Sequence, residues 1–185
     1  KSYDTATFYS ISNCQEGLSG VTLGNFLIKR VVYEIQEELP HINNFGTLSP
    51  IPGFADWFSY LDEVKIKNIL GNSKDKDVSF LKSKDFKLGD KRIVENKEII
   101  IKLVAHYIVN EKNHKGLPLN DVSRFHLGNG AIVDDIIVNA NVSEVGFKGS
   151  FGVMVNYLYE LTNIEKNHED YVNNKKIIVS NKIKK

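Results

Sequence analysis

Residues 5–39 contain a short apolar stretch, a polar turn and a longer amphipathic stretch. The first reads Thr-Ala-Thr-Phe-Tyr-Ser-Ile-Ser (5–12), and the last reads Thr-Leu-Gly-Asn-Phe-Leu-Ile-Lys-Arg-Val-Val-Tyr-Glu-Ile-Gln-Glu-Glu-Leu (22–39). β-Branched and aromatic residues in the first stretch predict a buried strand. Apolar residues of the last stretch recur at helical spacing until Pro40, which predicts an amphipathic helix over 22–39. We therefore expect a strand, a glycine-containing turn and a helix.

The turn between them, Asn13 to Gly20, has the chemistry of an anion site. Free N–H groups at a helix start attract phosphate, and Gly20 and Gly24 would let a pyrophosphate approach the backbone. Neither the dinucleotide-binding nor the P-loop glycine motif is present. Spacing alone thus leaves an ordinary strand-to-helix turn as the alternative.

The rest of the chain alternates between strand and helix patterns. We expect strands at 44–49, 131–142 and 152–161, helices at 54–70, 94–110 and 119–127, a charged surface insertion at 72–92, and a tail that frays over 172–185. This interleaving predicts the α/β (α+β) class, with a mixed twisted sheet flanked by helices in a single domain.

Composition excludes several classes of function. The 185 residues carry 24 Lys and Arg against 23 Asp and Glu, so no global field favours nucleic acid or an anionic membrane. No apolar run approaches the roughly 20 residues of a transmembrane helix. The single cysteine, Cys14, excludes an internal disulfide or a cysteine-based zinc site, and the five histidines show no metal-binding spacing. We expect no metal.

Six motifs together resemble the malonyl-CoA decarboxylase family. They are Phe-Tyr-Ser-Ile-Ser (8–12), Gln-x-Gly-Leu-x-Gly-Val (15–21), Leu-Gly-Asn-Phe-Leu-Ile-Lys (23–29), Leu-Ser-Pro-Ile-Pro-Gly-Phe (48–54), Arg-Phe-His-Leu-Gly-Asn-Gly-Ala (124–131) and Val-Asn-Tyr-Leu-Tyr (155–159). These motifs follow the family's order and cover most of the chain outside 59–95.

The resemblance implies the C-terminal catalytic domain of that enzyme, with a GNAT-type acyl-CoA-binding fold over residues 1–185. The implied reaction converts malonyl-CoA to acetyl-CoA and carbon dioxide without a cofactor. The chain has no initiator Met and no signal-peptide core, and we expect a fragment that lacks the family's N-terminal helical domain. The resemblance also implies that the full-length protein is a homo-oligomer. A cytoplasmic location is the default expectation, with a mitochondrion or another organelle as the alternative.

Specific residues carry the implied chemistry. Ser49 and His126 match the family's reacting pair, a hydroxyl that orients the malonyl group and an imidazole that reprotonates the enolate. Tyr159 and Ser10 match supporting positions. The implied coenzyme A cradle comprises Ser19, Gly20, Val21, Thr22, Leu23, Gly24 and Asn25.

Other interpretations remain open for these residues. Without the motifs, Ser49 is a turn residue before proline, His126 a structural histidine and Tyr159 a packed strand residue. The alternative functions are an acyl-CoA-dependent acyltransferase and a non-catalytic acyl-CoA-binding module.

The chain also departs from the family pattern. In the cradle, Ser19 and Thr22 stand where the general GNAT pattern has Gln or Arg and its first glycine. After His126, the departures are at Asp135, Ile137 and Val138. Both acids of the Asp134-Asp135 pair are expected on the surface.

Overall fold

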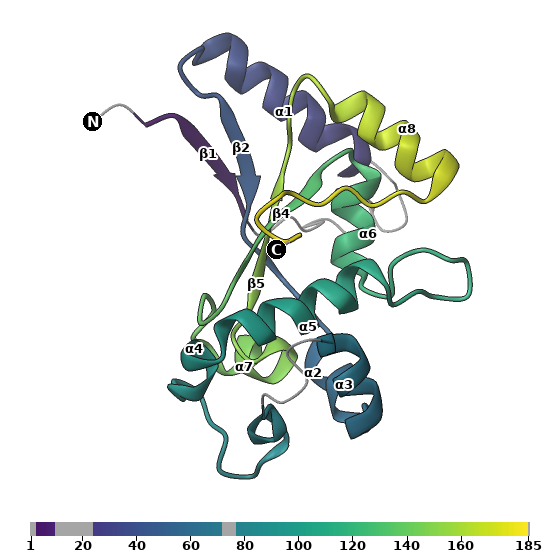
Figure 1. Ribbon diagram of the computed structural model, residues 1–185. Helices are drawn as coiled ribbons and strands as arrows, with labels where there is room; N and C mark the ends of the chain where they lie inside the picture. Colours follow the sequence, from purple (N-terminus) through teal and green to yellow (C-terminus); the bar gives the residue numbers. More distant parts are fainter. Residues whose placement is uncertain (1–2, 10–23, 72–76, 185) are drawn as a thin grey trace, which may run out of the picture.

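A computed structural model describes residues 3–9, 24–71 and 77–184 (Figure 1). A mixed sheet is built around the central strand β5 (Met154–Leu158). On one side β5 pairs antiparallel with β4 (Ile132–Ile137), and on the other with β2 (Asn44–Thr47) and β3 (Ser49–Pro50) in succession. β1 (Thr5–Phe8) adds to β2 in parallel. The predicted mixed sheet is confirmed, with shorter strands than the apolar patterns indicated.

The strand predicted over 44–49 is divided after Thr47 into β2 and β3, which both pair with β5. There the Thr47 N–H donates to Asn156 Oδ1 (3.3 Å), and the Tyr157 N–H donates to Thr47 Oγ1 (3.2 Å). These two bonds use side chains where a regular ladder would use only backbone groups. A Cβ on Gly46 would lie 2.8 Å from Asn156 Oδ1, so glycine leaves room for this arrangement. The chain thereby leaves β2 and begins β3 at Ser49.

Helices occupy both ends of the sheet (Figure 1). At the end where β1 and β2 lie, α1 (Gly24–Glu38) and α8 (Ile164–Asn174) are joined by the Lys29–Glu165 ion pair (3.2 Å). α6 (Asp121–Gly128) packs against α8 and β4. α5 (Lys97–Val109) contacts β4, and α7 (Glu144–Ser150) contacts β3. The short helix α4 (Arg92–Glu95) precedes α5.

The predicted helix over 54–70 is two helices. α2 (Phe54–Ser59) ends before Leu61, and α3 (Glu63–Leu70) begins after Asp62, whose Oδ1 accepts the Lys65 N–H at 2.8 Å. Asp is a strong N-cap residue, so it starts a new helix inside a continuous apolar pattern. The helices α7 and α8 were not predicted.

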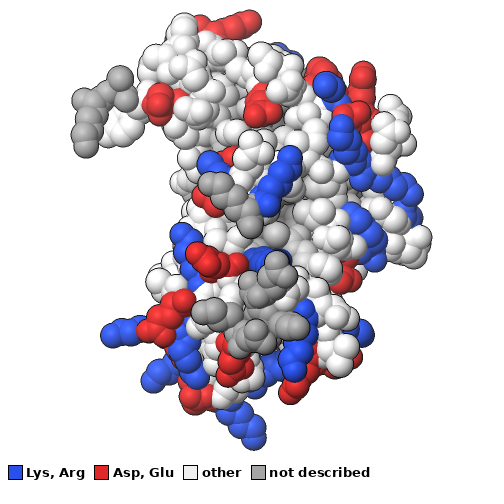
Figure 2. All heavy atoms as spheres, in the orientation of Figure 1, with Lys and Arg blue, Asp and Glu red and all other residues white. Residues whose placement is uncertain are grey.

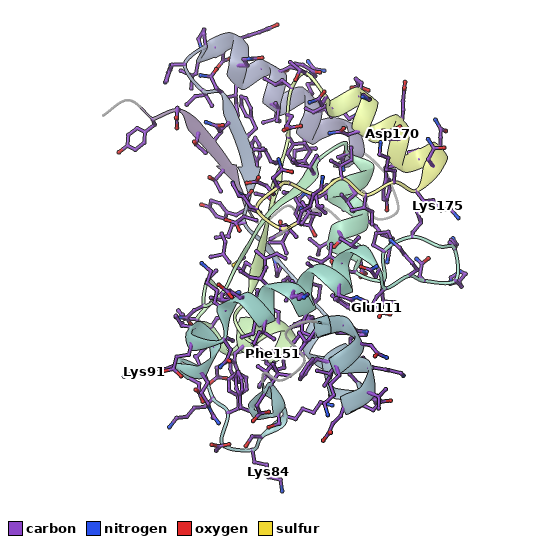
Figure 3. The ribbon with its side chains drawn as sticks, viewed as in Figure 1. Lys84, Lys91, Glu111, Phe151, Asp170 and Lys175 are labelled. Carbon is purple, nitrogen blue, oxygen red and sulfur yellow. The ribbon has the colours of Figure 1, made fainter. Side chains whose placement is uncertain are left out.

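An aromatic cluster fills the space between α2, α5 and α7. Phe151, at the end of α7, contacts the rings of Phe54, Phe58 and Phe86 with centroid distances of 5.9, 6.2 and 5.4 Å. Figure 3 shows Phe151 among these helices, away from α1 and α8. Phe86 belongs to the segment expected to be a charged surface insertion.

That segment, 72–92, is described from residue 77 onward. Its 3-10 helix, η3 (Ser79–Lys82), buries Phe80 and Leu81, and Val78 beside it is also buried. Lys84 and Lys91 are exposed, and Figure 3 shows both at the outer edge of the molecule. The lysines are solvated as expected, whereas the apolar side chains between them belong to the core.

The C-terminal segment does not fray where it is described. The Val133 N–H donates to the Ile178 carbonyl (3.0 Å), and the Ser180 N–H donates to the Val133 carbonyl (2.9 Å). Lys182 Nζ lies 2.7 Å from Asp134 Oδ2, and Asp134 is only 7% exposed. The predictions of a frayed tail and of a solvated Asp134 are therefore wrong, because the tail runs parallel to β4 and covers it.

Charges of both signs are interspersed on the face shown in Figure 2, as the net charge of +1 suggests. Among the described helices, none is long and apolar enough to cross a membrane.

Candidate functional site

Three of the predicted site residues meet in the structure. Ser49 is the first residue of β3, His126 lies in the last turn of α6, and Tyr159 directly follows β5. The side chains of all three are at least 95% buried. Ser49 Oγ lies 3.0 Å from His126 Nε2, and His126 Nδ1 lies 2.9 Å from the Tyr159 hydroxyl. One imidazole thus bridges two hydroxyl groups.

The directions of these hydrogen bonds follow from the neighbouring Thr47. The Ser49 hydroxyl donates to Thr47 Oγ1 (2.9 Å), so its remaining lone pair accepts from His126 Nε2–H. A neutral imidazole carries one proton, which leaves Nδ1 to accept the Tyr159 hydroxyl proton. The proton of His126 therefore faces Ser49.

Burial keeps this imidazole neutral. Loss of hydration lowers the pKa of His126 from 6.5 to about 4. Burial also raises the pKa of Tyr159 far above its ordinary value, so the hydroxyl that faces Nδ1 retains its proton. At neutral pH the site therefore offers an imidazole N–H donor without a positive charge.

A second tyrosine orients the ring from its face. Tyr157 stacks on His126 with centroids 4.5 Å apart and planes inclined by 20°. Its hydroxyl contacts Ser123 Oγ (2.7 Å), one helical turn before His126 on α6. Strand alternation places Tyr157 and Tyr159 on the same face of β5, which was the available sequence signal. We did not single out Thr47, Ser123 or Tyr157 from the sequence.

A cavity of about 300 Å³ opens beside Ser49 and His126. Its lining comprises Phe8, Tyr9, Leu48, Ser49, Pro50, Asp121, Val122, Phe125 and His126. Most of these side chains are apolar, and the only charged residue among them, Asp121, is 83% exposed. Of the described residues, no Lys or Arg lines this cavity. Among these described lining residues, a carboxylate placed here would find no cationic partner.

The other predicted site residues are less fully described. Ser10 and five cradle residues, Ser19, Gly20, Val21, Thr22 and Leu23, lie outside the described residues. Gly24 and Asn25 are the first two residues of α1 as the structure describes it.

The three departures from the family pattern that follow His126 lie on or directly after β4. Asp135 pairs with Asn156 of β5, Ile137 pairs with Met154, and Val138 follows the strand. None of the three belongs to the lining of the 300 Å³ cavity.

Two further features lie apart from this site. A cavity of about 680 Å³ between α3 and η3 shares no lining residue with the Ser49–His126 cavity. Within residues 3–9, 24–71 and 77–184, no three His, Cys, Asp or Glu side chains group together as metal ligands. Independence from a cofactor stays a prediction.

Comparison with known proteins places this geometry in context. The family model "Malonyl-CoA decarboxylase C-terminal domain" matches residues 1–185. Mitochondrial malonyl-CoA decarboxylases of Rattus norvegicus and Anser anser anser are 39% and 38% identical to the chain over 96% and 97% of its length. The chain spans only 40% and 39% of these two relatives.

Solved structures agree. Malonyl-CoA decarboxylases from Rhodopseudomonas palustris and Cupriavidus metallidurans match 97% and 98% of the chain, with TM-scores of 0.80 and 0.82 and identities of 41% and 38%. The chain covers 41% and 48% of those structures. The prediction of a mixed α/β fold of the GNAT type is confirmed.

Proposed function

Because the chain belongs to the family of malonyl-CoA decarboxylase C-terminal domains, we propose that it converts malonyl-CoA to acetyl-CoA and carbon dioxide. The observation that supports this most directly is the neutral Ser49–His126–Tyr159 chain at the wall of an apolar cavity. The proposal extends to the substrate, because the relatives are named for malonyl-CoA.

The cavity favours loss of the carboxylate. Breaking the bond between the carboxylate and the methylene carbon releases neutral carbon dioxide and leaves the electron pair on a thioester enolate. Since the described lining lacks a cation and is mostly apolar, the carboxylate is poorly stabilised there. Its negative charge moves in the reaction to the thioester oxygen, which hydrogen-bond donors can stabilise.

Ser49 and His126 supply the donor and the proton. In our proposal the Ser49 hydroxyl orients the malonyl group, and the N–H of the neutral imidazole meets the developing enolate. A neutral imidazole can donate a hydrogen bond to the enolate oxygen. It can then protonate the carbon, because the enolate carbon is a stronger base than the imidazolate that this transfer leaves. The proton passes to the methylene carbon to form the acetyl group, and the ring regains a proton from solvent. Before this transfer, and again once the ring has regained a proton, the Tyr159 hydroxyl on Nδ1 keeps the donor hydrogen on Nε2.

Coenzyme A would bind at the start of α1. We propose the cradle Ser19–Asn25 on the family resemblance, supported by the position of Gly24 and Asn25 at the N-terminus of a 15-residue helix. The backbone N–H groups would hold the pyrophosphate, so the side-chain departures at Ser19 and Thr22 leave the main contacts intact.

A mass-spectrometric time course of malonyl-CoA with the 185-residue chain tests the function. Acetyl-CoA should appear without any acyl acceptor, and His126→Ala should abolish it. His106→Ala is the matched control, because His106 is a partly buried histidine on α5 outside the cavity. Conversion that depends on an added amine would instead indicate an acyltransferase.

Two further properties belong to the proposal. If the chain binds malonyl-CoA without converting it, the assay is repeated with the remaining segment of the relatives joined to it. Inactivity there would indicate a binding module. We also propose that the full-length protein is a homo-oligomer, which light scattering would test. The rat and goose relatives are named mitochondrial, so imaging would distinguish a mitochondrial from a cytoplasmic location.

A further inference from the structure

Asn120 lies between the two segments that carry the reacting pair. It is the N-cap of α6, the helix of His126, and its side chain is 99% buried. Its Oδ1 accepts two hydrogen bonds from Ser123, one from the backbone N–H (2.9 Å) and one from Oγ–H (3.0 Å). The oxygen of this amide thus fixes the first turn of α6.

The nitrogen of the same amide holds the segment that follows Ser49. Asn120 Nδ2 donates to the Pro52 carbonyl at 2.8 Å, across 68 positions of sequence. Pro50 and Pro52 have no N–H, so this short segment cannot be anchored through donors at those positions. The Tyr107 hydroxyl also contacts the Pro52 carbonyl, at the longer distance of 3.3 Å.

Asn120 also connects to the face of the imidazole. Because Ser123 Oγ–H donates to Asn120, Ser123 Oγ accepts the Tyr157 hydroxyl proton (2.7 Å). The Tyr157 ring stacks on His126. A continuous set of hydrogen bonds therefore runs from Pro52 through Asn120 and Ser123 to the ring that packs on His126.

We propose that Asn120 is a positioning residue for the decarboxylation, which sets the approach of Ser49 to His126 by joining the Pro52 carbonyl to α6. The proposal rests on the proposed function. Neither reacting side chain touches Asn120 in the hydrogen bonds described, so its effect passes through the backbone of both segments. Asn120 is buried, so its amide has no solvent to replace a lost partner.

Asn120→Asp isolates the contact with Pro52. Aspartate is an equally good N-cap, so α6 keeps its first turn, whereas a carboxyl oxygen now faces the Pro52 carbonyl. We expect kcat to fall by about 10- to 100-fold, since displacements near 1 Å cost that much. KM should change by less than about threefold, because the proposed cradle lies elsewhere.

Asn167→Asp is the matched control. Asn167 is also a buried asparagine whose Nδ2 donates to a backbone carbonyl, that of Gly130, at 3.2 Å. Both variants should lose thermal stability, but only Asn120→Asp should lose kcat. Equal kcat values in the two variants would overturn the proposal. Asn120→Ser, which caps the helix but is too short to reach Pro52, replaces Asn120→Asp if that variant does not fold.

A double variant separates positioning from general damage. In the Ser49→Ala background the hydroxyl is already absent, so adding Asn120→Asp should lower residual kcat by less than about twofold. A drop as large as in the unmodified protein would mean that Asn120 acts independently of Ser49, against the proposal.

NMR of the His126 ring gives a readout that does not need turnover. In Asn120→Asp, the Nε2 and Hε2 signals should move away from their hydrogen-bonded positions, and Asn167→Asp should leave them unchanged. If the unmodified chain released no carbon dioxide, the proposed function would fail. The ring signals would still test whether the contact between Asn120 and Pro52 positions His126. Unchanged ring signals in Asn120→Asp would refute it.

Discussion

The hydroxyl of Tyr159 lies 2.9 Å from Nδ1 of His126, on the side of the ring opposite Ser49. Both partners are buried, so water does not compete for either group. The contact selects the tautomer in which Nε2 carries the proton and directs that proton to Ser49. Tyr159, which does not line the cavity, thus determines which nitrogen of His126 presents a proton toward Ser49.

Tyr159→Phe should remove the preference of His126 for the tautomer with its proton on Nε2. With no donor on Nδ1, the neutral ring redistributes between its two tautomers, and kcat should fall by about 100-fold, the lower end of acid–base effects. Nitrogen NMR of the imidazole should show Nδ1 becoming partly protonated. Tyr33→Phe, at a 41% exposed tyrosine of α1, is the control and should match the unmodified chain. An unchanged ring spectrum in Tyr159→Phe would contradict the tautomer assignment.

Stability should fall in mild acid because of His126. The pKa is about 4 in the folded chain and 6.5 for an ordinary histidine, so the unfolded state binds more protons between these values. Its contribution is complete above about pH 7 and is lost progressively as the pH falls through 6.5 toward 4. Between about pH 7.5 and about pH 5, the unfolding free energy should drop by about 2 kcal/mol more in the unmodified chain than in His126→Gln.

Urea unfolding at the two pH values measures this difference. Carboxylates that titrate in the same range contribute to both proteins and cancel in the comparison. His41→Gln, at an exposed histidine, should follow the unmodified chain. Parallel curves for all three proteins would mean that His126 titrates normally.

Gly46→Ala should disturb the break between β2 and β3. The added Cβ would lie 2.8 Å from Asn156 Oδ1, so the amide must rotate and give up the Thr47 N–H. We expect a loss of about 1–2 kcal/mol in unfolding free energy, the cost of a buried group without its partner. Turnover should fall as well, because Thr47 holds the Ser49 hydroxyl.

Gly149→Ala provides the comparison for that variant. Apart from its chain neighbours and the backbone of its own helix, no described atom lies within 4 Å of a Cβ built on Gly149 in α7. Alanine there should therefore be neutral or stabilise by up to about 1 kcal/mol. Chemical denaturation and the turnover assay measure both variants. A Gly46→Ala protein as stable and active as Gly149→Ala would show that Asn156 is dispensable.

Removal of the chain after residue 177 should expose the edge of β4. The Val133 N–H would lose the Ile178 carbonyl, and Asp134 would lose Lys182. Hydrogen exchange at the Val133 amide should accelerate at least about tenfold, following the loss of one hydrogen bond of about 1.4 kcal/mol. The Tyr159 amide, bonded to the Phe45 carbonyl, should keep its protection. Unchanged exchange at Val133 would mean that the tail does not cover β4 in solution.

The sequence by itself determined the elements whose signals are local. The helix α1 has apolar residues at helical spacing and a proline after its end, and α6 ends at Gly128 as predicted, because these signals act within a few residues. The motifs around Ser49 and His126 are local as well, and they are sufficient to indicate the family and both side chains.

Only the tertiary structure decided how these parts meet. Ser49 and His126 are 77 positions apart, and Asn120 and Pro52 are 68 apart, so no local pattern encodes either contact. The same holds for the tail on β4 and for the buried face of η3, where long-range burial overrides a polar composition. The low pKa of His126 likewise arises from desolvation by side chains that converge from several elements. The sequence indicated Ser49 and His126 as candidate site residues, and packing determined their distance and protonation, because both properties depend on what surrounds the two side chains in space.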